Sequence, residues 1–226
     1  MISLSTFCSF GAHRKVRIGS FYFRVVRNDY KLLKFNDYIS LFKRPLANRG
    51  EFIPMKRKRV NLSITDGIAM VLLDRPEVLN ALDQQMWEEL VNVFRSATND
   101  PKVRVVIISG IGRGFCVGAD LKEVAWRGES QIQSRRRIEA NNQQLAREMI
   151  GAPMPIIAAI NGYALGGGVE IALAADLRIA SAEARLGFPE TTIGRFISGG
   201  ASLMLPRAVG IAWAKRLIYT GEHIDA

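Results

Sequence analysis

The strongest constraint on the fold is the alternation of strand-like and helix-like segments that begins at Val60. Residues 60–65 and 68–73 are apolar or alternate in polarity around Asp66-Gly67, which is typical of a β-hairpin. The later strand-like runs are short and rich in β-branched or small apolar residues: 103–109, 156–160 and 177–180. Strands that alternate with helices imply an α/β fold with crossover connections.

Three segments carry the helical pattern between these strands. Asp83 is placed to cap a helix that runs to about Ala97, and its apolar face comprises Met86, Trp87, Leu90, Val91 and Phe94. Residues 127–150 are polar and rich in Arg, with helical spacing of Ile138, Leu145 and Met149. A third helix is expected over residues 169–175. The chain of 226 residues is long enough for one sizeable core.

Residues 1–54 differ in composition from the remainder. They carry ten Lys and Arg against three Asp and Glu, a net charge of +7, whereas residues 55–226 carry 21 against 18, or +3. The chain is therefore interpreted as a basic N-terminal extension, 1–54, followed by a core domain, 55–226. The extension is either a targeting segment or a start of translation placed too early. Because the basic charge belongs mostly to the extension, nucleic-acid binding is not expected of the core.

Cysteine and histidine are too sparse to suggest a metal centre. The two cysteines, Cys8 and Cys116, and the two histidines, His13 and His223, are far apart in the sequence. This spacing predicts no disulfide framework and no zinc site, and it makes a histidine-based catalytic triad hard to build. No stretch of about 18 apolar residues suggests a membrane-spanning helix.

Two segments share a design in which a strand is followed by a tight turn of small residues and then a helix start. They are 115–123 and 161–170. Such turns present backbone N–H groups at the positive end of a helix, and two converging N–H groups form an oxyanion hole. Either turn alone could be purely structural. A dinucleotide site at Gly110-x-Gly112 is disfavoured because Phe115 stands where a third small residue is needed.

Five blocks in a fixed order carry a resemblance to a known family: 73–82, 115–123, 161–176, 187–190 and 206–210. Residues from about 60 to 226 resemble the crotonase, or enoyl-CoA hydratase-isomerase, superfamily. The resemblance implies an α/β fold built as a spiral of ββα units, usually assembled as trimers or hexamers. It also implies that the chain stops before the family's last helices, which leaves trimer formation open.

The resemblance assigns binding roles to residues of the two turns. The N–H groups of Ala119 and Gly167 form the oxyanion hole for the thioester carbonyl of an acyl-CoA. Asp120, Leu121 and Lys122 line the CoA channel. Lys122 is read equally well as a solvated lysine at a helix start. No metal and no cofactor is implied, and CoA enters only as part of the substrate.

Two carboxylates determine the implied reaction. Glu170 and Glu190 occupy the positions of the two glutamates of hydratases in the family. Hydration of an α,β-unsaturated thioester needs a base for the attacking water and an acid for the α-carbon. Glu190 is assigned as the proton donor and Glu170 as the base that orients water. The chain is therefore interpreted as an enoyl-CoA hydratase-like lyase.

The segment after Glu190 departs from the family pattern. Ser198 stands where a proline or small residue is usual, and Arg195 and Phe196 could reshape the acyl pocket. Two alternatives remain open: a truncated, non-catalytic protein that binds CoA or partner subunits, and an isomerase or retro-aldol lyase of the same superfamily. A bacterial cytoplasm is the expected compartment, or a mitochondrion if residues 1–54 act as a transit peptide.

Overall fold

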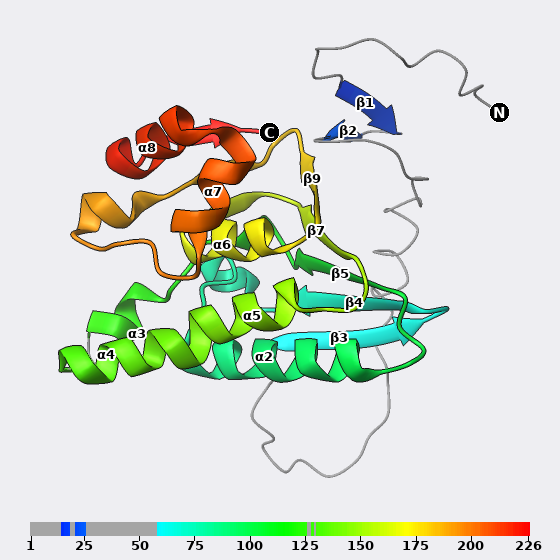
Figure 1. The fold of residues 1–226 in the computed structure, drawn as a ribbon. Helices are drawn as coiled ribbons and strands as arrows, with labels where there is room; N and C mark the ends of the chain where they lie inside the picture. The colour runs from blue at the N-terminus through cyan, green and yellow to red at the C-terminus, as the bar shows by residue number, and fades with distance from the viewer. Residues whose placement is uncertain (1–14, 19–20, 26–57, 126–127, 129) are drawn as a thin grey trace. The chain divides into compact units, whose positions relative to one another are not determined.

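The computed structural model of the chain describes residues 15–18, 21–25, 58–125, 128 and 130–226 (Figure 1). The chain divides into a larger compact unit, which contains residues 58–226, and a second unit of residues 27–57. The second unit lies outside the described residues. So do the expected domain boundary after residue 54 and most of the basic extension.

The described residues form two sheets, and the larger has seven strands in the order β1-β2-β9-β7-β5-β4-β3. Its strands are β1 (Lys15–Ile18), β2 (Phe21–Val25), β3 (Val60–Thr65), β4 (Ile68–Leu73), β5 (Val105–Gly110), β7 (Ile156–Ile160) and β9 (Leu177–Ser181). Strands β4, β5, β7 and β9 run parallel, and the outer pairings β3–β4, β1–β2 and β2–β9 are antiparallel. The central strands are parallel, and parallel strands are usually covered on both faces. This agrees with the runs of β-branched residues in the sequence.

A second sheet of four strands has the order β11-β10-β8-β6. Its strands are β6 (Gly114–Cys116), β8 (Tyr163–Leu165), β10 (Arg185–Gly187) and β11 (His223–Asp225). The pairs β5/β6, β7/β8 and β9/β10 each place their first strand in the large sheet and their second in the small one. Helical segments follow each pair, so the expected spiral of ββα units is confirmed.

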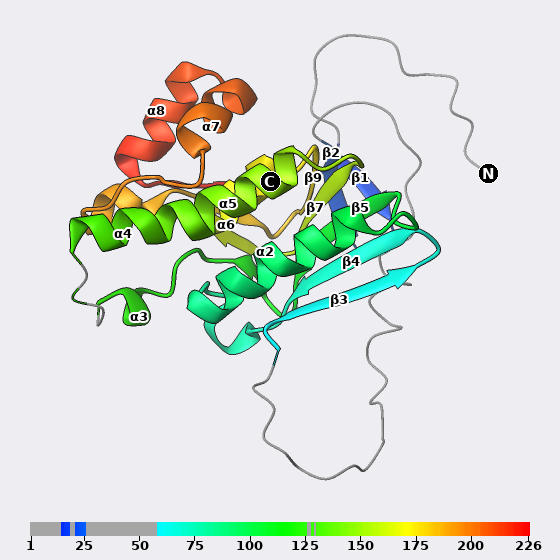
Figure 2. The ribbon, with the colours of Figure 1, turned by 60° about the horizontal axis from the view of Figure 1, so that its bottom comes forward.

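The helices follow the strand pairs in the sequence. They are α2 (Gln84–Asn99), α3 (Leu121–Ala125), α4 (Gln131–Ile138), α5 (Gln144–Ile150), α6 (Gly167–Ala174), α7 (Ala201–Val209) and α8 (Ile211–Thr220). Short turns η1 (Pro76–Val78), η2 (Glu139–Gln143) and η3 (Pro189–Ile193) complete the set. Helix α2 contacts β3 and α5, α5 contacts α6, and α7 lies between α6 and α8 (Figures 1 and 2).

The predicted local elements agree closely with the structure. Asp66 and Gly67 both have positive φ at the turn of the β3–β4 hairpin. Asp83 caps α2 by accepting a hydrogen bond from Met86 N at 2.9 Å. The predicted apolar face of α2 is buried, as are Phe115 and Phe188 in the same core. The third helix begins at Gly167, two residues before the predicted start.

Two features differ from the sequence interpretation. The composition of residues 1–54 indicates no regular structure, whereas Lys15–Ile18 and Phe21–Val25 form an antiparallel pair of strands, the second of which pairs with β9. This pairing continues the edge of the sheet, which a local pattern does not reveal. The helical segment 127–150 is interrupted by a π-helical turn, Glu139–Gln143, between α4 and α5.

Candidate active site

The N-terminus of α6 is the centre of the candidate site. Gly166 precedes the helix with φ +50°, a backbone conformation that favours glycine, and its N–H donates to Gly187 O at 2.9 Å. The helix then begins at Gly167, whose N–H is one of the helix donors without an intrahelical acceptor. Glu170 lies in the first turn and is the only charged residue of α6. The positive end of the helix therefore faces the same region as this carboxylate.

The turn before α3 lies against this helix start. A Cβ on Gly118 would come within 2.9 Å of both Gly167 N and Leu165 O, so only glycine allows the approach. One hydrogen bond on each side of Ala119 holds this turn against Leu82. Leu82 N donates to Gly118 O at 2.8 Å, and Asp120 N donates to Leu82 O at 2.9 Å. Within the described residues, the Ala119 N–H donates no hydrogen bond.

Glu170 is a buried carboxylate with specific partners. Glu170 is only 5% exposed. Its Oε1 accepts hydrogen bonds from Ser198 N at 2.8 Å and from Gly199 N at 2.6 Å. Burial raises the pKa of Glu170, and the two N–H donors and the Asn142 amide oppose that rise. Glu170 is therefore not a solvent-exposed surface carboxylate, as most glutamates are.

Glu190 lies on η3, beside the same helix start. Its carboxyl group contacts the position that a Cβ on Gly166 would occupy. Its Oε2 atom is buried and has no hydrogen-bond partner among the described residues. Burial raises the pKa of Glu190 to about 7, the negative charge of Glu170 adds to the rise, and Arg195 opposes it. At neutral pH this carboxyl group is thus divided between its acid and base forms.

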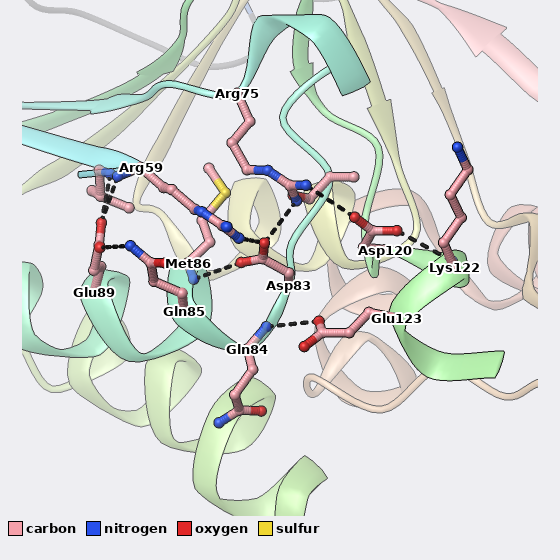
Figure 3. Close-up of polar contacts among 12 residues, drawn as sticks. Arg59, Arg75, Asp83, Gln84, Gln85, Met86, Glu89, Asp120, Lys122 and Glu123 are labelled. Carbon is pink, nitrogen blue, oxygen red and sulfur yellow. Dashed lines mark hydrogen bonds and ion pairs between the residues drawn. The ribbon is translucent and has the colours of Figure 1, made fainter. Parts of the chain in front are cut away.

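A polar cluster holds the Ala119 turn against the rest of the domain (Figure 3). The Arg75 guanidinium lies between two carboxylates, 3.2 Å from Asp83 Oδ2 and 3.1 Å from Asp120 Oδ2. It also donates to Ala81 O at 2.6 Å. Arg59 forms a further ion pair with Asp83. Arg75 therefore links the N-cap of α2 to the residue that follows Ala119.

The three residues expected to line a CoA channel lie at the start of α3. The Asp120 carboxylate is engaged by Arg75 and accepts a hydrogen bond from Lys122 N at 3.2 Å (Figure 3). Leu121 is 51% exposed, and Lys122 is exposed. Both side chains are thus accessible to a ligand, and their role in CoA binding stays a prediction.

A small cavity adjoins Glu170. Its volume is about 10 Å³, which is roughly the room for one water molecule. Its walls come from α2, the π turn, α5, α6 and the loop before α7: Trp87, Asn142, Leu145, Ala146, Met149, Gly167, Glu170, Ile171, Ala174 and Gly199. Sequence reasoning missed Asn142 and the Arg75 cluster, because the polar 127–150 segment and an ordinary Arg offer no distinctive signal.

The residues described by the structure include no group of three His, Cys, Asp or Glu side chains that could bind a metal. Cys116 is a buried free thiol, and burial raises its pKa to about 12. No helix in the described part of the chain is long and apolar enough to cross a membrane. The acid–base groups gathered at this site are Glu170 and Glu190.

A sequence profile of the enoyl-CoA hydratase/isomerase family matches residues 63–226. The chain belongs to this family. The crystal structure of an enoyl-CoA hydratase from Bacillus anthracis superposes with a TM-score of 0.70 at 39% identity, covering 75% of this chain and 65% of that one. The fold and the family membership expected from the five sequence blocks are both confirmed.

Curated relatives within the family have related names. The short-chain-enoyl-CoA hydratase of Clostridium acetobutylicum is 38% identical over 173 residues, 76% of this chain and 65% of its own length. The (E)-benzylidenesuccinyl-CoA hydratase of Thauera aromatica is 39% identical over 168 residues, 74% of this chain and 64% of its own length. The human mitochondrial enoyl-CoA hydratase domain-containing protein 2 is 40% identical over 160 residues, 70% of this chain and 54% of its own length. The chain thus spans less than two thirds of these relatives.

Proposed function

We propose that the protein is an enoyl-CoA hydratase that adds water reversibly across the double bond of an α,β-unsaturated acyl-CoA. The observation that carries the proposal is the pair of carboxyl groups, Glu170 and Glu190, at the N-terminus of α6. Family membership supports it, as do relatives named for hydration of enoyl-CoA thioesters.

The proposed reaction begins with binding of the thioester carbonyl oxygen. The N–H groups of Ala119 and Gly167 donate to it and stabilise the negative charge that develops as the enolate forms. Removing one donor of this kind typically costs about 2.7–4 kcal/mol of transition-state stabilisation. Both donors are backbone N–H groups. Their position is therefore set by the surrounding turns and not by the side chains of Ala119 and Gly167.

The two carboxyl groups divide the proton transfers. Glu170, as the carboxylate, accepts a proton from the water whose oxygen bonds to the β-carbon. The π electrons of the double bond move into the enolate, and Glu190 delivers its proton to the α-carbon. Glu170 ends protonated and Glu190 ionised, and one proton transfer between them restores the starting state. A pKa of about 7 suits Glu190 to this exchange at neutral pH.

The test is hydration of short-chain enoyl-CoA thioesters, followed by the loss of their enone absorbance. Glu170→Gln and Glu190→Gln are each expected to lower kcat by about 10²–10⁴. Glu183→Gln is the matched control, because Glu183 is an exposed glutamate of the same domain. Near wild-type turnover in either site variant contradicts the mechanism, and product analysis separates hydration from isomerisation or retro-aldol cleavage.

The assembly and the compartment are part of the same proposal. We infer a homotrimer or hexamer, as in the family, and exposed apolar side chains on α8 such as Ile211 and Trp213 are consistent with subunit contacts. Light scattering of the purified chain measures this state. A bacterial cytoplasm is proposed, or a mitochondrion as for the human relative, and cell fractionation distinguishes them.

A further inference from the structure

The π-helical turn η2 places two consecutive asparagines in different environments. A π turn adds one residue to the helical repeat, and such turns are frequent at functional sites. Asn141 is 3% exposed and donates through Nδ2 to Gln84 Oε1 on α2 at 3.1 Å. Asn142 contacts a different segment, because its Nδ2 donates to Ser198 Oγ at 3.0 Å. The turn therefore reaches the loop before α7 through one side chain, that of Asn142.

That loop supplies the two backbone hydrogen-bond donors of Glu170. Ser198 N and Gly199 N both donate to Glu170 Oε1, at 2.8 and 2.6 Å. Residues 195–200 lie outside regular secondary structure, so neither a helix nor a strand holds these two N–H groups in place. Gly199 also has to be glycine, because a Cβ there would meet the Glu170 carboxylate. A neighbouring element can therefore hold the loop in place through a hydrogen bond to the Ser198 side chain.

Asn142 also lines the cavity beside Glu170. Asn142, Glu170 and Gly199 all contribute to its wall. Asn142 therefore touches the loop and also faces the space beside the carboxylate. A merely solvated amide on the polar helix would do neither.

We infer that Asn142 is a positioning residue for Glu170: through Ser198 it holds the Ser198–Gly199 N–H pair against the carboxylate. This inference rests on the proposed function, and it assigns to Asn142 and Ser198 a role that the family motifs do not require. Ser198 replaces the usual proline or small residue at its position, and its hydroxyl accepts the Asn142 amide. Asn142 acts through the loop, its own amide also favours the ionised form of Glu170 directly, and Glu170 remains the group that exchanges the proton. Ser198→Ala tests the loop route alone, because it leaves the direct contact of Asn142 with Glu170 in place.

The consequence of losing Asn142 has a definite sign. Hydrogen bonds to a carboxylate favour its ionised form, so the donors hold the pKa of Glu170 below the level that burial alone would set. Loosening them raises that pKa and moves the acid limb of kcat/KM to higher pH, because Glu170 must be ionised to accept a proton. The charged groups on this side of the site are Glu190 on η3 and Arg195 beyond it, and neither is altered.

The experiment measures the Glu170 pKa directly and the kinetics alongside it. Glutamate labelled with ¹³C at the carboxyl carbon is titrated by NMR, and the Glu170 signal is assigned with Glu170→Gln. Asn142→Leu is expected to raise the pKa of Glu170 by about 0.5–1 pH unit and to lower kcat about three- to tenfold, with KM little changed. Ser198→Ala keeps both N–H donors and is expected to shift the pKa in the same direction, with little further effect in the Asn142→Leu background.

Gln84→Ala is the matched control. It removes the acceptor of Asn141 from the same π turn and leaves the Asn142–Ser198 contact in place. An unchanged Glu170 pKa in Asn142→Leu and Ser198→Ala, or an equal shift in Gln84→Ala, overturns the inference. If the wild-type protein hydrates no thioester but the pKa shift is present, the positioning role stands and the proposed function fails.

Discussion

Replacing Glu190 with glutamine should stabilise the fold at alkaline pH while removing activity. The carboxyl group is half-buried, its Oε2 lacks a partner among the described residues, and its pKa is raised from 4.5 to about 7. Glutamine resembles the protonated acid in size and shape but carries no charge. The variant therefore removes the cost of burying the ionised form and little else.

The magnitude follows from the pKa. A pKa of about 7 in place of 4.5 makes ionisation in the fold costlier by about 3 kcal/mol, and partial exposure reduces this to about 1.5 kcal/mol. Because the folded pKa is the higher one, the protonated group favours the fold fully below about pH 4.5. That contribution is lost as the pH rises through about 7. Glu190→Gln should then melt about 3–6 °C above wild type at pH 8.

The assay is thermal unfolding of both proteins at pH 5 and at pH 8. At pH 5 the folded wild type carries a mostly protonated Glu190 and only the unfolded chain is partly ionised, so the advantage of the variant should be much smaller than at pH 8. Glu183→Gln, at an exposed position, should show no comparable widening of the difference between these pH values. A Glu190→Gln advantage that is absent at pH 8, or equal at both pH values, refutes the reasoning.

Three further changes have expected outcomes. Gly166→Ala should lower the free energy of unfolding by about 1–2 kcal/mol in urea titration and should lower kcat. The reason is that φ is +50° and the new methyl group meets the Glu190 carboxyl. Unchanged stability and kcat would contradict the close approach of Glu190 to Gly166. Arg75→Met should lower the free energy of unfolding by about 3 kcal/mol, since it leaves Asp83 and Asp120 without their shared partner, whereas Arg75→Lys should recover part of the loss. The forward hydration rate should fall as pH rises through about 7, because Glu190 loses its proton. A rate that does not change between pH 6 and pH 9 would exclude Glu190 as the proton donor.

The elements that sequence predicted well are those whose signals are local. Asp66-Gly67 requires only the two strands on either side, and the cap at Asp83 needs only the next three residues. The apolar face of α2 follows from helical spacing alone. The π turn at Glu139–Gln143 was missed because one extra residue in a helical repeat changes hydrogen bonding without changing composition.

The candidate site divides in the same way. Glu170 and Glu190 could be selected because each lies in a short motif, next to a glycine turn. Asn142 could not, because its importance depends on contact with Ser198, 56 residues away in the chain. Arg75 likewise meets Asp120 only through a contact 45 residues apart. Neither contact has a local pattern that would distinguish it from a solvated side chain.

The sequence by itself determined the α/β class, the family and the two carboxylates, because periodicity, turn chemistry and short motifs are written in neighbouring residues. Only the tertiary structure decided the state of those carboxylates. Folding buries Glu170 at the start of α6, supplies it with two N–H donors from the loop at Ser198 and Gly199, and leaves a buried oxygen of Glu190 without a partner among the described residues. The pKa of a carboxyl group depends on burial and on neighbouring charges and donors, and these come from segments that meet only when the chain is folded.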